Sequence, residues 1–249
     1  MHSNEDKPIF GIHPIKEALE NGKSVDRLFI QERTQNDMLK ELASLARMME
    51  IPVKYVPEMK LNRITRKNHQ GCVAFLAPID FQPLDEVIQQ VYERGETPLI
   101  VVFDGITDVR NLGAVARSAL CSGAHALVLP FKSSAPVNAD AVKTSAGALL
   151  QIPVCKPKYI NEAKQLLKTY GIPLIACHGK AQKTIYQASL DAPAAIVIGD
   201  EEKGISEQML RSCDDEVKIP MLGNFDSLNV SVAAGITLFE AVRQRAGGK

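Results

Sequence analysis

Three segments of the chain carry polar residues at spacings that suit chemistry on a ligand. The first, residues 104–117, follows an apolar run and contains Asn111, Gly113 and Arg117. On a helix, Gly113 and Arg117 share a face that is otherwise small and apolar. A guanidinium there needs an anionic or polar partner. That partner could be a bound ligand, or it could be a carboxylate of the chain in a structural ion pair. Asn111 could be an ordinary helix cap.

The second segment, residues 194–204, is an apolar run that enters an acidic turn between Gly199 and Gly204. Gly199 can let a ligand approach the backbone closely, and Gly204 can adopt a positive φ. The turn places Glu201 just beyond the end of the predicted strand. A plain strand-to-helix turn with a solvated charge cluster is the alternative interpretation.

The third segment, residues 219–234, predicts a short strand, a polar loop and a helix. The strand and loop contain three apolar residues, Ile219, Met221 and Leu228, beside the hydroxyl of Ser227 and the amide of Asn229. Serine and asparagine are also typical helix caps. In that case Met221 and Leu228 would belong to the core rather than to a ligand pocket.

These segments follow strands in a chain that alternates between strand and helix. Continuous apolar runs at residues 99–103, 126–129, 173–176, 194–198 and 217–219 predict strands, with helical patterns between most of them. This alternation indicates an α/β domain with a parallel sheet covered on both faces. Ligands of such sheets bind beyond the carboxyl ends of the strands, where the three segments fall.

The part of the chain before this sheet predicts a separate small α/β domain over residues 1–78. It has strand-like runs at 25–30, 52–56 and 72–76 and a helical pattern at 38–49. Residues 79–97 are predicted to be a linker, because proline and glycine punctuate them around a short helical run at 84–92. Residues 98–249 form the second predicted domain.

A basic run lies near the end of the N-terminal domain. It contains five cations with only Glu58 against them: Lys54, Lys60, Arg63, Arg66 and Lys67. A solvated helix face with its following loop is one interpretation, and a phosphate-binding surface for nucleic acid is the other. The formal net charge of zero argues against a protein that coats nucleic acid through bulk charge, but it permits a local contact surface.

Composition and missing motifs exclude several classes of protein. No apolar run approaches the roughly 20 residues that span a bilayer, and the N-terminus lacks the pattern of a signal peptide; we therefore expect a cytoplasmic protein. The five cysteines include no Cys-x-x-Cys pair, which predicts reduced thiols and no metal site. The glycine motifs of dinucleotide oxidoreductases, nucleotide triphosphatases and serine hydrolases are absent from the sequence.

The three segments in combination resemble the SpoU (TrmH-like) RNA 2′-O-methyltransferases. The matching patterns are Asn-x-Gly-x-x-x-Arg, Gly-x-Glu-x-x-Gly and Ile-Pro-Met-x-Gly-x-x-x-Ser-Leu-Asn-Val-Ser, in this order and at these intervals. Asp200 departs from the small residue common in the family. Residues 9–19 and the end of the chain resemble the bacterial 23S rRNA guanosine-2′-O-methyltransferase subgroup.

The resemblance implies a C-terminal SPOUT domain with a trefoil knot, a ribosomal-protein-like N-terminal domain that binds RNA, and a homodimer. It implies S-adenosylmethionine (SAM) as the cofactor, in a pocket formed by Gly199, Ile219, Met221 and Leu228. It also implies methyl transfer to a ribose 2′-hydroxyl by a set of catalytic residues: Arg117, Asn111, Glu201, Ser227 and Asn229. The basic run would contact the RNA.

By the same resemblance, Arg117 lies at the reacting hydroxyl. Arginine stays protonated at neutral pH and is a poor base, so Arg117 would stabilise the developing alkoxide or hold a neighbouring phosphate; both roles stay open. In a dimer it would act beside the cofactor of the other subunit. The expected substrate is a guanosine of 23S ribosomal RNA. The alternatives are a transfer-RNA 2′-O-methyltransferase and a non-catalytic RNA-binding relative.

Overall fold

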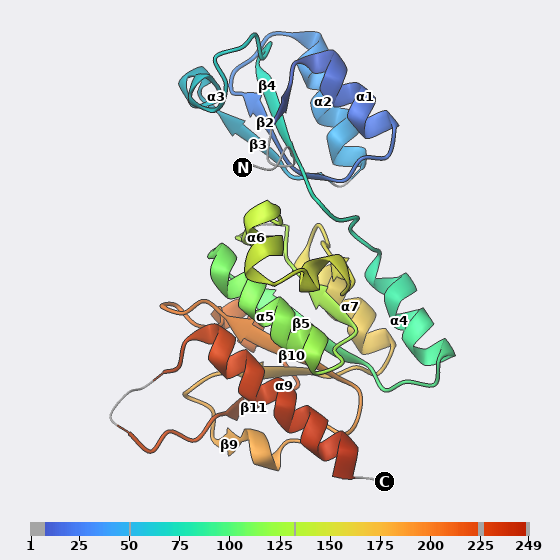
Figure 1. Ribbon diagram of the computed structural model, residues 1–249, viewed down its shortest axis with the longest axis vertical. Coiled ribbons are helices and arrows are strands. Elements are labelled where there is room, and N and C mark those ends of the chain that lie inside the picture. The colour runs from blue at the N-terminus through green and yellow to red at the C-terminus, as the bar shows by residue number, and fades with distance from the viewer. Residues whose placement is uncertain (1–7, 50, 132, 224–226, 248–249) are drawn as a thin grey trace. The chain divides into compact units, whose positions relative to one another are not determined.

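The chain forms two compact units in a computed structural model (Figure 1). The structure describes residues 8–49, 51–131, 133–223 and 227–247. The N-terminal unit comprises Met1–Asp80 with Pro136–Ala139, and the C-terminal unit comprises Phe81–Ala135 with Asp140–Lys249. Among the described residues, no helix is long and apolar enough to cross a membrane.

The N-terminal unit is a four-stranded sheet with helices on both faces. Its strands lie in the order β1-β4-β2-β3, and β4 runs antiparallel to both of its neighbours. Leu28 and Ile30 of β2 face a core shared with α1 and α2, whereas Phe29 faces Leu61 of α3. The elements are β1 (Ile9–Phe10), α1 (Ile12–Glu20), β2 (Val25–Gln31), α2 (Asp37–Met48), β3 (Val53–Val56), α3 (Glu58–Ile64) and β4 (Cys72–Leu76).

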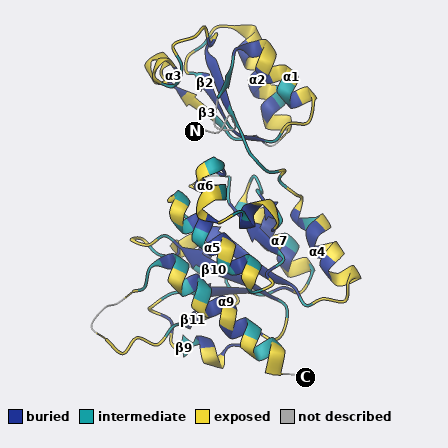
Figure 2. Cartoon of the chain, in the orientation of Figure 1, coloured by how far each residue is buried: buried dark blue, intermediate teal, exposed yellow. Residues whose placement is uncertain are grey.

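The C-terminal unit contains a seven-stranded sheet in the order β7-β6-β5-β10-β8-β11-β9, with every pairing parallel. The central strands β5 and β10 are buried along their lengths, which explains their continuous apolar sequences (Figure 2). The strands are β5 (Leu99–Asp104), β6 (Ala126–Val128), β7 (Val154–Cys155), β8 (Leu174–Cys177), β9 (Lys183–Thr184), β10 (Ala194–Gly199) and β11 (Asp215–Lys218).

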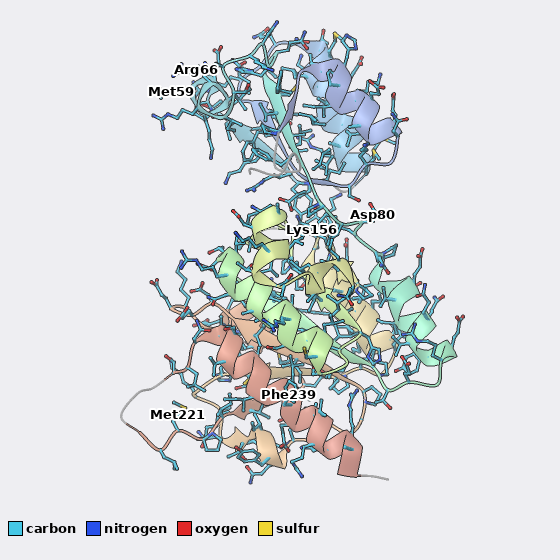
Figure 3. The ribbon with its side chains drawn as sticks, viewed as in Figure 1. Met59, Arg66, Asp80, Lys156, Met221 and Phe239 are labelled. Atoms are coloured by element: carbon cyan, nitrogen blue, oxygen red, sulfur yellow. The ribbon has the colours of Figure 1, made fainter. Side chains whose placement is uncertain are left out.

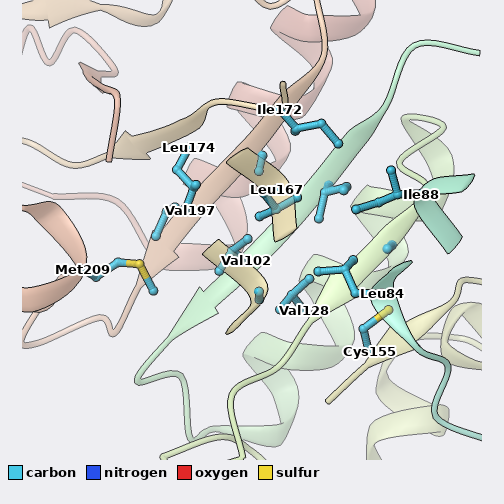
Figure 4. Close-up of a cluster of buried hydrophobic side chains, with 14 of the residues drawn as sticks. Leu84, Ile88, Val102, Val128, Cys155, Leu167, Ile172, Leu174, Val197 and Met209 are labelled. Atoms are coloured by element: carbon cyan, nitrogen blue, oxygen red, sulfur yellow. The ribbon is translucent and has the colours of Figure 1, made fainter. Parts of the chain in front are cut away.

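Helices cover both faces of this sheet. On one face, α4, α7 and α8 close an apolar cluster over alternate residues of β5 and β10, among them Val102 and Val197 (Figure 4). On the other face, α5 and α9 pack side by side (Figure 1). The helices are α4 (Leu84–Glu93), α5 (Val109–Cys121), α6 (Ala139–Thr144), α7 (Ile160–Thr169), α8 (Glu207–Leu210) and α9 (Val230–Gly247).

The α/β class and the parallel sheet predicted from the sequence are confirmed. The strands that the sequence did not reveal, β1, β7 and β9, are two residues long and too short to show a period. The helical run within residues 79–97 forms α4, and its residues Leu84, Val87 and Ile88 belong to the core of the C-terminal unit. Much of the expected linker is therefore part of that unit.

Two residues, Gly113 and Arg245, fix the helices that lead to the candidate site. A Cβ on Gly113 would lie 2.2 Å from Thr144 Oγ1, so α5 can press against α6 only because this residue is glycine. At the far end of α9, the Arg245 guanidinium donates to four carbonyl oxygens, those of Thr97, Pro98, Leu190 and Ala192, at 2.7–3.0 Å. These bonds tie α9 to the chain that leads into β5 and β10.

Candidate cofactor and catalytic site

The carboxyl ends of the central strands carry two hollows that share a wall. The first has a volume of about 140 Å³ and lies between the ends of β8 and β10, the loop after β11 and the start of α9. The second, of about 710 Å³, lies between the β5–α5 loop and the β10–α8 turn. Asp200, Glu201 and Gly204 line both hollows, so the β10–α8 turn is the shared wall.

The first hollow brings together all four residues predicted to bind the cofactor: Gly199, Ile219, Met221 and Leu228. Met221 is 37% exposed and Leu228 is half-buried, so neither is the core residue of the alternative interpretation (Figure 3). An apolar slot with backbone groups at its rim is the kind of site that holds a flat heterocycle such as adenine. The lining residues therefore fit the adenine ring of SAM, whereas the hollow of about 140 Å³ is smaller than the roughly 300–1,000 Å³ of sites that hold a whole cofactor.

The turn between β10 and α8 owes its shape to glycine and aspartate. A Cβ on Gly199 would lie 2.3 Å from the Gly204 carbonyl carbon, so glycine is required by the chain's own backbone rather than by a ligand's approach. Gly204 adopts φ +68°, as predicted. Asp200 accepts hydrogen bonds from the backbone N–H groups of Glu202 and Lys203, both at 3.0 Å. Asp200, the departure from the family pattern, thus closes the turn.

Three of the predicted catalytic residues form one hydrogen-bonded cluster. The side-chain amides of Asn111 and Asn229 each donate to Glu201 Oε2 at 3.2 Å, and Asn229 also donates to Asn111 Oδ1 at 3.1 Å. This cluster joins the start of α5, the β10–α8 turn and the start of α9. Segments up to 118 residues apart in the sequence therefore meet at one point.

The helix caps at this point separate the two interpretations of the motif residues. Asp108 caps α5, because its Oδ1 accepts from the N–H groups of Arg110 and Asn111 at 2.6 and 3.1 Å. Asn111 is therefore not the cap, and its side chain serves the cluster. Asn229 does both: its Oδ1 accepts from the Ser231 N–H at 2.9 Å while its amide nitrogen holds the cluster.

The remaining two predicted residues lie apart from this cluster. Ser227 is exposed and lines the first hollow with Glu201. Arg117 is exposed on α5 and lines neither hollow. Within the described parts of the chain Arg117 makes no hydrogen bond or ion pair. The alternative interpretation, a structural ion pair, therefore finds no carboxylate partner there. Its neighbour Ser118 faces α9, with its Oγ 3.6 Å from a Cβ built on Gly235.

Sequence patterns missed two residues of the first hollow, Cys177 and His178. Cys177 Sγ lies 3.3 Å from Thr237 Oγ1, and burial raises the pKa of this thiol. His178 Nε2 lies 2.8 Å from Glu216 Oε2. Neither residue belongs to a recognisable motif. Their position just beyond the predicted strand at 173–176 was the available signal, because ligands gather at carboxyl ends.

All five residues of the basic run are exposed on the N-terminal unit. Lys54 lies on β3, Lys60 and Arg63 on α3, and Arg66 and Lys67 in the loop that follows. None of the five forms an ion pair with any residue that the structure describes. The Lys60 ammonium lies 5.3 Å from the centre of the Phe29 ring, a cation–π contact.

Comparisons with known proteins bear on both units. Residues 98–239 match the model of the SpoU rRNA Methylase family, and residues 8–82 match the model for RNA 2′-O ribose methyltransferase substrate binding. The chain is 36% identical, over 97% of its length and 98% of the relative's, to the 23S rRNA (guanosine-2′-O-)-methyltransferase RlmB of Vibrio parahaemolyticus. It is 31% identical, over 95% of both chains, to YacO of Bacillus subtilis, whose name provisionally assigns it to the TrmH family of tRNA/rRNA methyltransferases.

A solved structure agrees with these relatives. The SpoU methyltransferase AviRb from Streptomyces viridochromogenes, in complex with AdoMet, superposes with a TM-score of 0.64 at 26% identity. The match covers 98% of this chain and 92% of AviRb. The resemblance seen in the three motifs is thereby confirmed, and the chain belongs to the SpoU rRNA methylase family.

Proposed function

We propose that this protein, a SAM-dependent RNA ribose 2′-O-methyltransferase, modifies a guanosine of 23S ribosomal RNA. The observation that carries the proposal is the Asn111–Glu201–Asn229 cluster beside an apolar hollow that suits an adenine ring. The choice of substrate is supported by likeness to RlmB over nearly the whole chain. A ribosomal RNA substrate implies a protein that works in the cytoplasm.

The first hollow is the proposed cofactor site. Ile219, Met221 and Leu228 would hold the adenine between apolar side chains, and the backbone at Gly199 would bound the pocket. SAM bound there supplies the methyl group on a sulfonium that is already a good leaving group.

The residues of the chain have to activate a weak nucleophile. A ribose hydroxyl reacts poorly until its proton is removed or strongly hydrogen-bonded. Glu201 Oε2 is held by two amides, whereas its Oε1 makes no hydrogen bond within the described chain. Glu201 Oε1 would accept a hydrogen bond from a ribose hydroxyl of the substrate, and Asn111, Asn229 and Ser227 would position that carboxylate and the loop.

Arg117 completes the proposed site as the residue at the reacting oxygen. Its charge would stabilise the alkoxide that develops there or hold the neighbouring phosphate. Because Arg117 lines neither hollow of its own chain, an Arg117 at the reacting oxygen would have to come from another copy of the chain. We propose that it acts beside the SAM held by a second subunit of a homodimer.

An apolar stripe on α9 supports this dimer. Val232, Ile236 and Phe239 share a face of the helix and are 48%, 36% and 51% exposed; Figure 3 labels Phe239. A stripe of large exposed apolar side chains on a folded domain marks a contact surface. It lies on the helix that packs against α5, the helix that carries Arg117. A subunit docked on this stripe would bury it and would approach Arg117.

The trefoil knot expected of the family is part of the proposal. It is supported by the strand order, because β10 and β11 come last in the sequence yet lie between strands formed earlier. In such a knot, the C-terminal part of the chain would pass through a loop formed by segments that precede it.

Methyl transfer tests the proposed function. Labelled SAM is supplied with 23S ribosomal RNA or with transfer RNA, each lacking 2′-O-methyl marks, and the modified nucleotide is mapped. A single 2′-O-methylguanosine in the 23S RNA is expected. Labelling of transfer RNA alone would overturn the substrate. Labelling of neither RNA, with SAM still bound, would favour a non-catalytic RNA-binding relative.

A further inference from the structure

A third hollow lies wholly within the N-terminal unit and has a volume of about 820 Å³. Ligand sites typically measure about 300–1,000 Å³. Its walls are the start of α1, the β2–α2 connection, and α3 with the loop that leads to β4. We call it the N-terminal hollow and define it by six of its lining residues: Asn36, Asn62, Arg66, Lys67, Asn68 and Gln70.

The loop that forms one wall is held in a single arrangement. His69 is buried, and its Nδ1 accepts from the Gly71 N–H at 3.0 Å. Its Nε2 therefore carries the proton and donates to Asn62 Oδ1 at 3.0 Å. Gly71 has φ +81°, and a Cβ there would lie 2.7 Å from Leu39 Cδ1. The loop thus presses against α2 and presents its outer side chains from a fixed base.

Four side-chain amides of the hollow have their oxygen atom occupied by a donor from the same unit. The acceptors are Asn36, Asn62, Asn68 and Gln70, bonded in that order to the Met38 N–H, His69 Nε2–H, Gln70 N–H and Ile12 N–H at 3.0, 3.0, 3.3 and 3.0 Å. Their NH₂ groups make no hydrogen bond to any residue that the structure describes. The pinned oxygens fix the amide orientations and leave four NH₂ groups as donors.

The charged residues of the hollow also favour an anionic ligand. Arg66 (labelled in Figure 3) and Lys67 are exposed cations without an ion pair among the described residues, and Glu58 is the one carboxylate in the lining. The N-cap residue of α1, Gly11, has no side chain that could accept, so beyond the Ile12–Gln70 hydrogen bond the first turn adds the positive end of a helix dipole. The hollow therefore offers hydrogen-bond donors and positive charge. Its matching ligand is anionic and rich in acceptors.

We propose that the N-terminal hollow binds the sugar–phosphate backbone of an unpaired segment of the RNA substrate. Phosphate oxygens, ribose hydroxyls and base carbonyls are acceptors, and they outnumber donors along an RNA strand. A single strand can enter a concave site, as it does in grooves that track the backbone. The inference rests on the proposed function for the RNA and adds the place where the RNA is held.

The proposal also divides the basic run. Arg66 and Lys67 line the hollow, whereas Lys54, Lys60 and Arg63 do not. On α3, Glu58 and Asn62 are four residues apart and face the hollow, while Lys60 lies on another side of the helix against Phe29. The first pair of cations would contact the bound strand directly, and the other three would attract the RNA at longer range.

The double substitution Asn68→Asp with Gln70→Glu tests the proposal. Each change keeps the pinned oxygen and replaces the NH₂ donor with an anionic oxygen, so the local hydrogen bonds survive. We expect the dissociation constant of the full-length protein for an unmodified 23S rRNA transcript to rise at least tenfold. The melting temperature and the dissociation constant for SAM should stay at wild-type values.

The matched control is Asn21→Asp with Lys23→Gln. It changes the net charge equally, and both exposed residues lie in the α1–β2 turn, outside the hollow. The control should bind the transcript within twofold of wild type. Equal RNA binding by the two double variants would overturn the proposal. If wild type binds the transcript but methylates only transfer RNA, the 23S substrate fails, and the same comparison with transfer RNA still tests the hollow.

Competition tests the unpaired character of the ligand. A single-stranded oligoribonucleotide should displace the labelled transcript at a lower concentration than the same sequence annealed into a duplex. The N68D/Q70E protein should lose this difference. If the duplex competes as well as the single strand against wild type, the hollow does not select an unpaired segment.

Discussion

The two units offer RNA opposite kinds of concave surface. The N-terminal hollow presents amide donors and cations around one carboxylate. The second hollow of the C-terminal unit is lined by five carboxylates and one lysine: Asp104, Asp108, Asp200, Glu201, Glu202 and Lys203. A polyanion is attracted to the first surface and repelled by the second. Affinity for RNA and the methyl-transfer chemistry should therefore depend on different units.

The carboxylates of the C-terminal unit make hydrogen bonds within the chain that explain their presence near the proposed RNA site. Asp104 Oδ2 accepts from the Ser206 N–H at 2.6 Å, Asp108 caps α5, and Asp200 closes the β10–α8 turn. Each of these acids holds a loop at the carboxyl end of a strand. In the N-terminal hollow the hydrogen bonds within the unit are made by amide oxygens, so the NH₂ donors are the groups that face a ligand.

The largest effect is expected from Arg117→Ala. Removing a charge that stabilises the developing alkoxide typically costs 10²–10³ in rate, so kcat should fall by about that factor. Because Arg117 is exposed and unpaired among the described residues, the melting temperature should not change. The control is Arg211→Ala, an exposed arginine of α8's C-terminal end that lines neither hollow. A kcat within threefold of wild type would remove Arg117 from the chemistry.

Mixing subunits sharpens the same point. Arg117→Ala and a variant with a damaged SAM hollow, such as Gly199→Ala, are each expected to be strongly impaired as homodimers when SAM is supplied well below the variant's dissociation constant. If Arg117 works beside the partner's cofactor, mixed dimers regain one working site and a fraction of the activity. Mixtures that stay inactive after subunit exchange would instead place Arg117 and SAM in the same chain's site.

Gly199→Ala should come next in size and should act through the C-terminal unit alone. A methyl group 2.3 Å from the Gly204 carbonyl carbon forces the turn to shift, which should cost about 1–3 kcal/mol of unfolding free energy. The dissociation constant for SAM should rise by about tenfold or more, with RNA binding retained. Gly235→Ala is the control, because its Cβ would meet Ser118 Oγ at an ordinary 3.6 Å. Chemical denaturation and calorimetric titration with SAM measure both quantities.

Charge removal at Lys60 and Arg63 should have a smaller effect, confined to RNA binding. Each phosphate contact that is lost lowers the slope of log affinity against log salt by about 0.7–0.9. If Lys60 and Arg63 attract RNA only at longer range, this slope should fall in the K60Q/R63Q protein by less than the amount expected for the loss of one phosphate contact. A larger loss would make this part of α3 a direct phosphate contact. Filter binding at a series of salt concentrations gives the slope.

The smallest effect is expected from His125, which lies at the amino ends of the central strands. Burial, with help from Arg245 and Arg94, lowers its pKa, and Glu96 at 3.2 Å opposes the shift. The unfolded chain takes up a proton near pH 6.5, and the folded chain resists it. The free energy of unfolding should therefore fall as the pH drops below that value. In His125→Gln this dependence should be weaker; an unchanged pH profile would contradict the assignment.

Sequence patterns predicted what periodicity and motif spacing encode. β5 and β10 were evident because both faces are buried, and the motif residues of the first hollow share the ends of such strands. The reason for Gly199 could not be predicted, since it depends on where Gly204 returns in space. Asp108 and Asn111 are both good caps, and only the fold shows that Asp108 takes that role. The N-terminal hollow has no motif, because it depends on which amide atoms are pinned.

The division of labour between the units is tested most directly by measuring kcat and KM for RNA in one assay for two variants. Glu201→Gln keeps the size of the side chain and removes its charge from the cluster. It should lower kcat at least tenfold and leave KM for RNA within twofold of wild type. The N68D/Q70E protein should raise KM for RNA at least tenfold at an unchanged kcat. If Glu201→Gln acted on KM alone, or the N-terminal pair on kcat alone, the separation of binding from chemistry would be wrong.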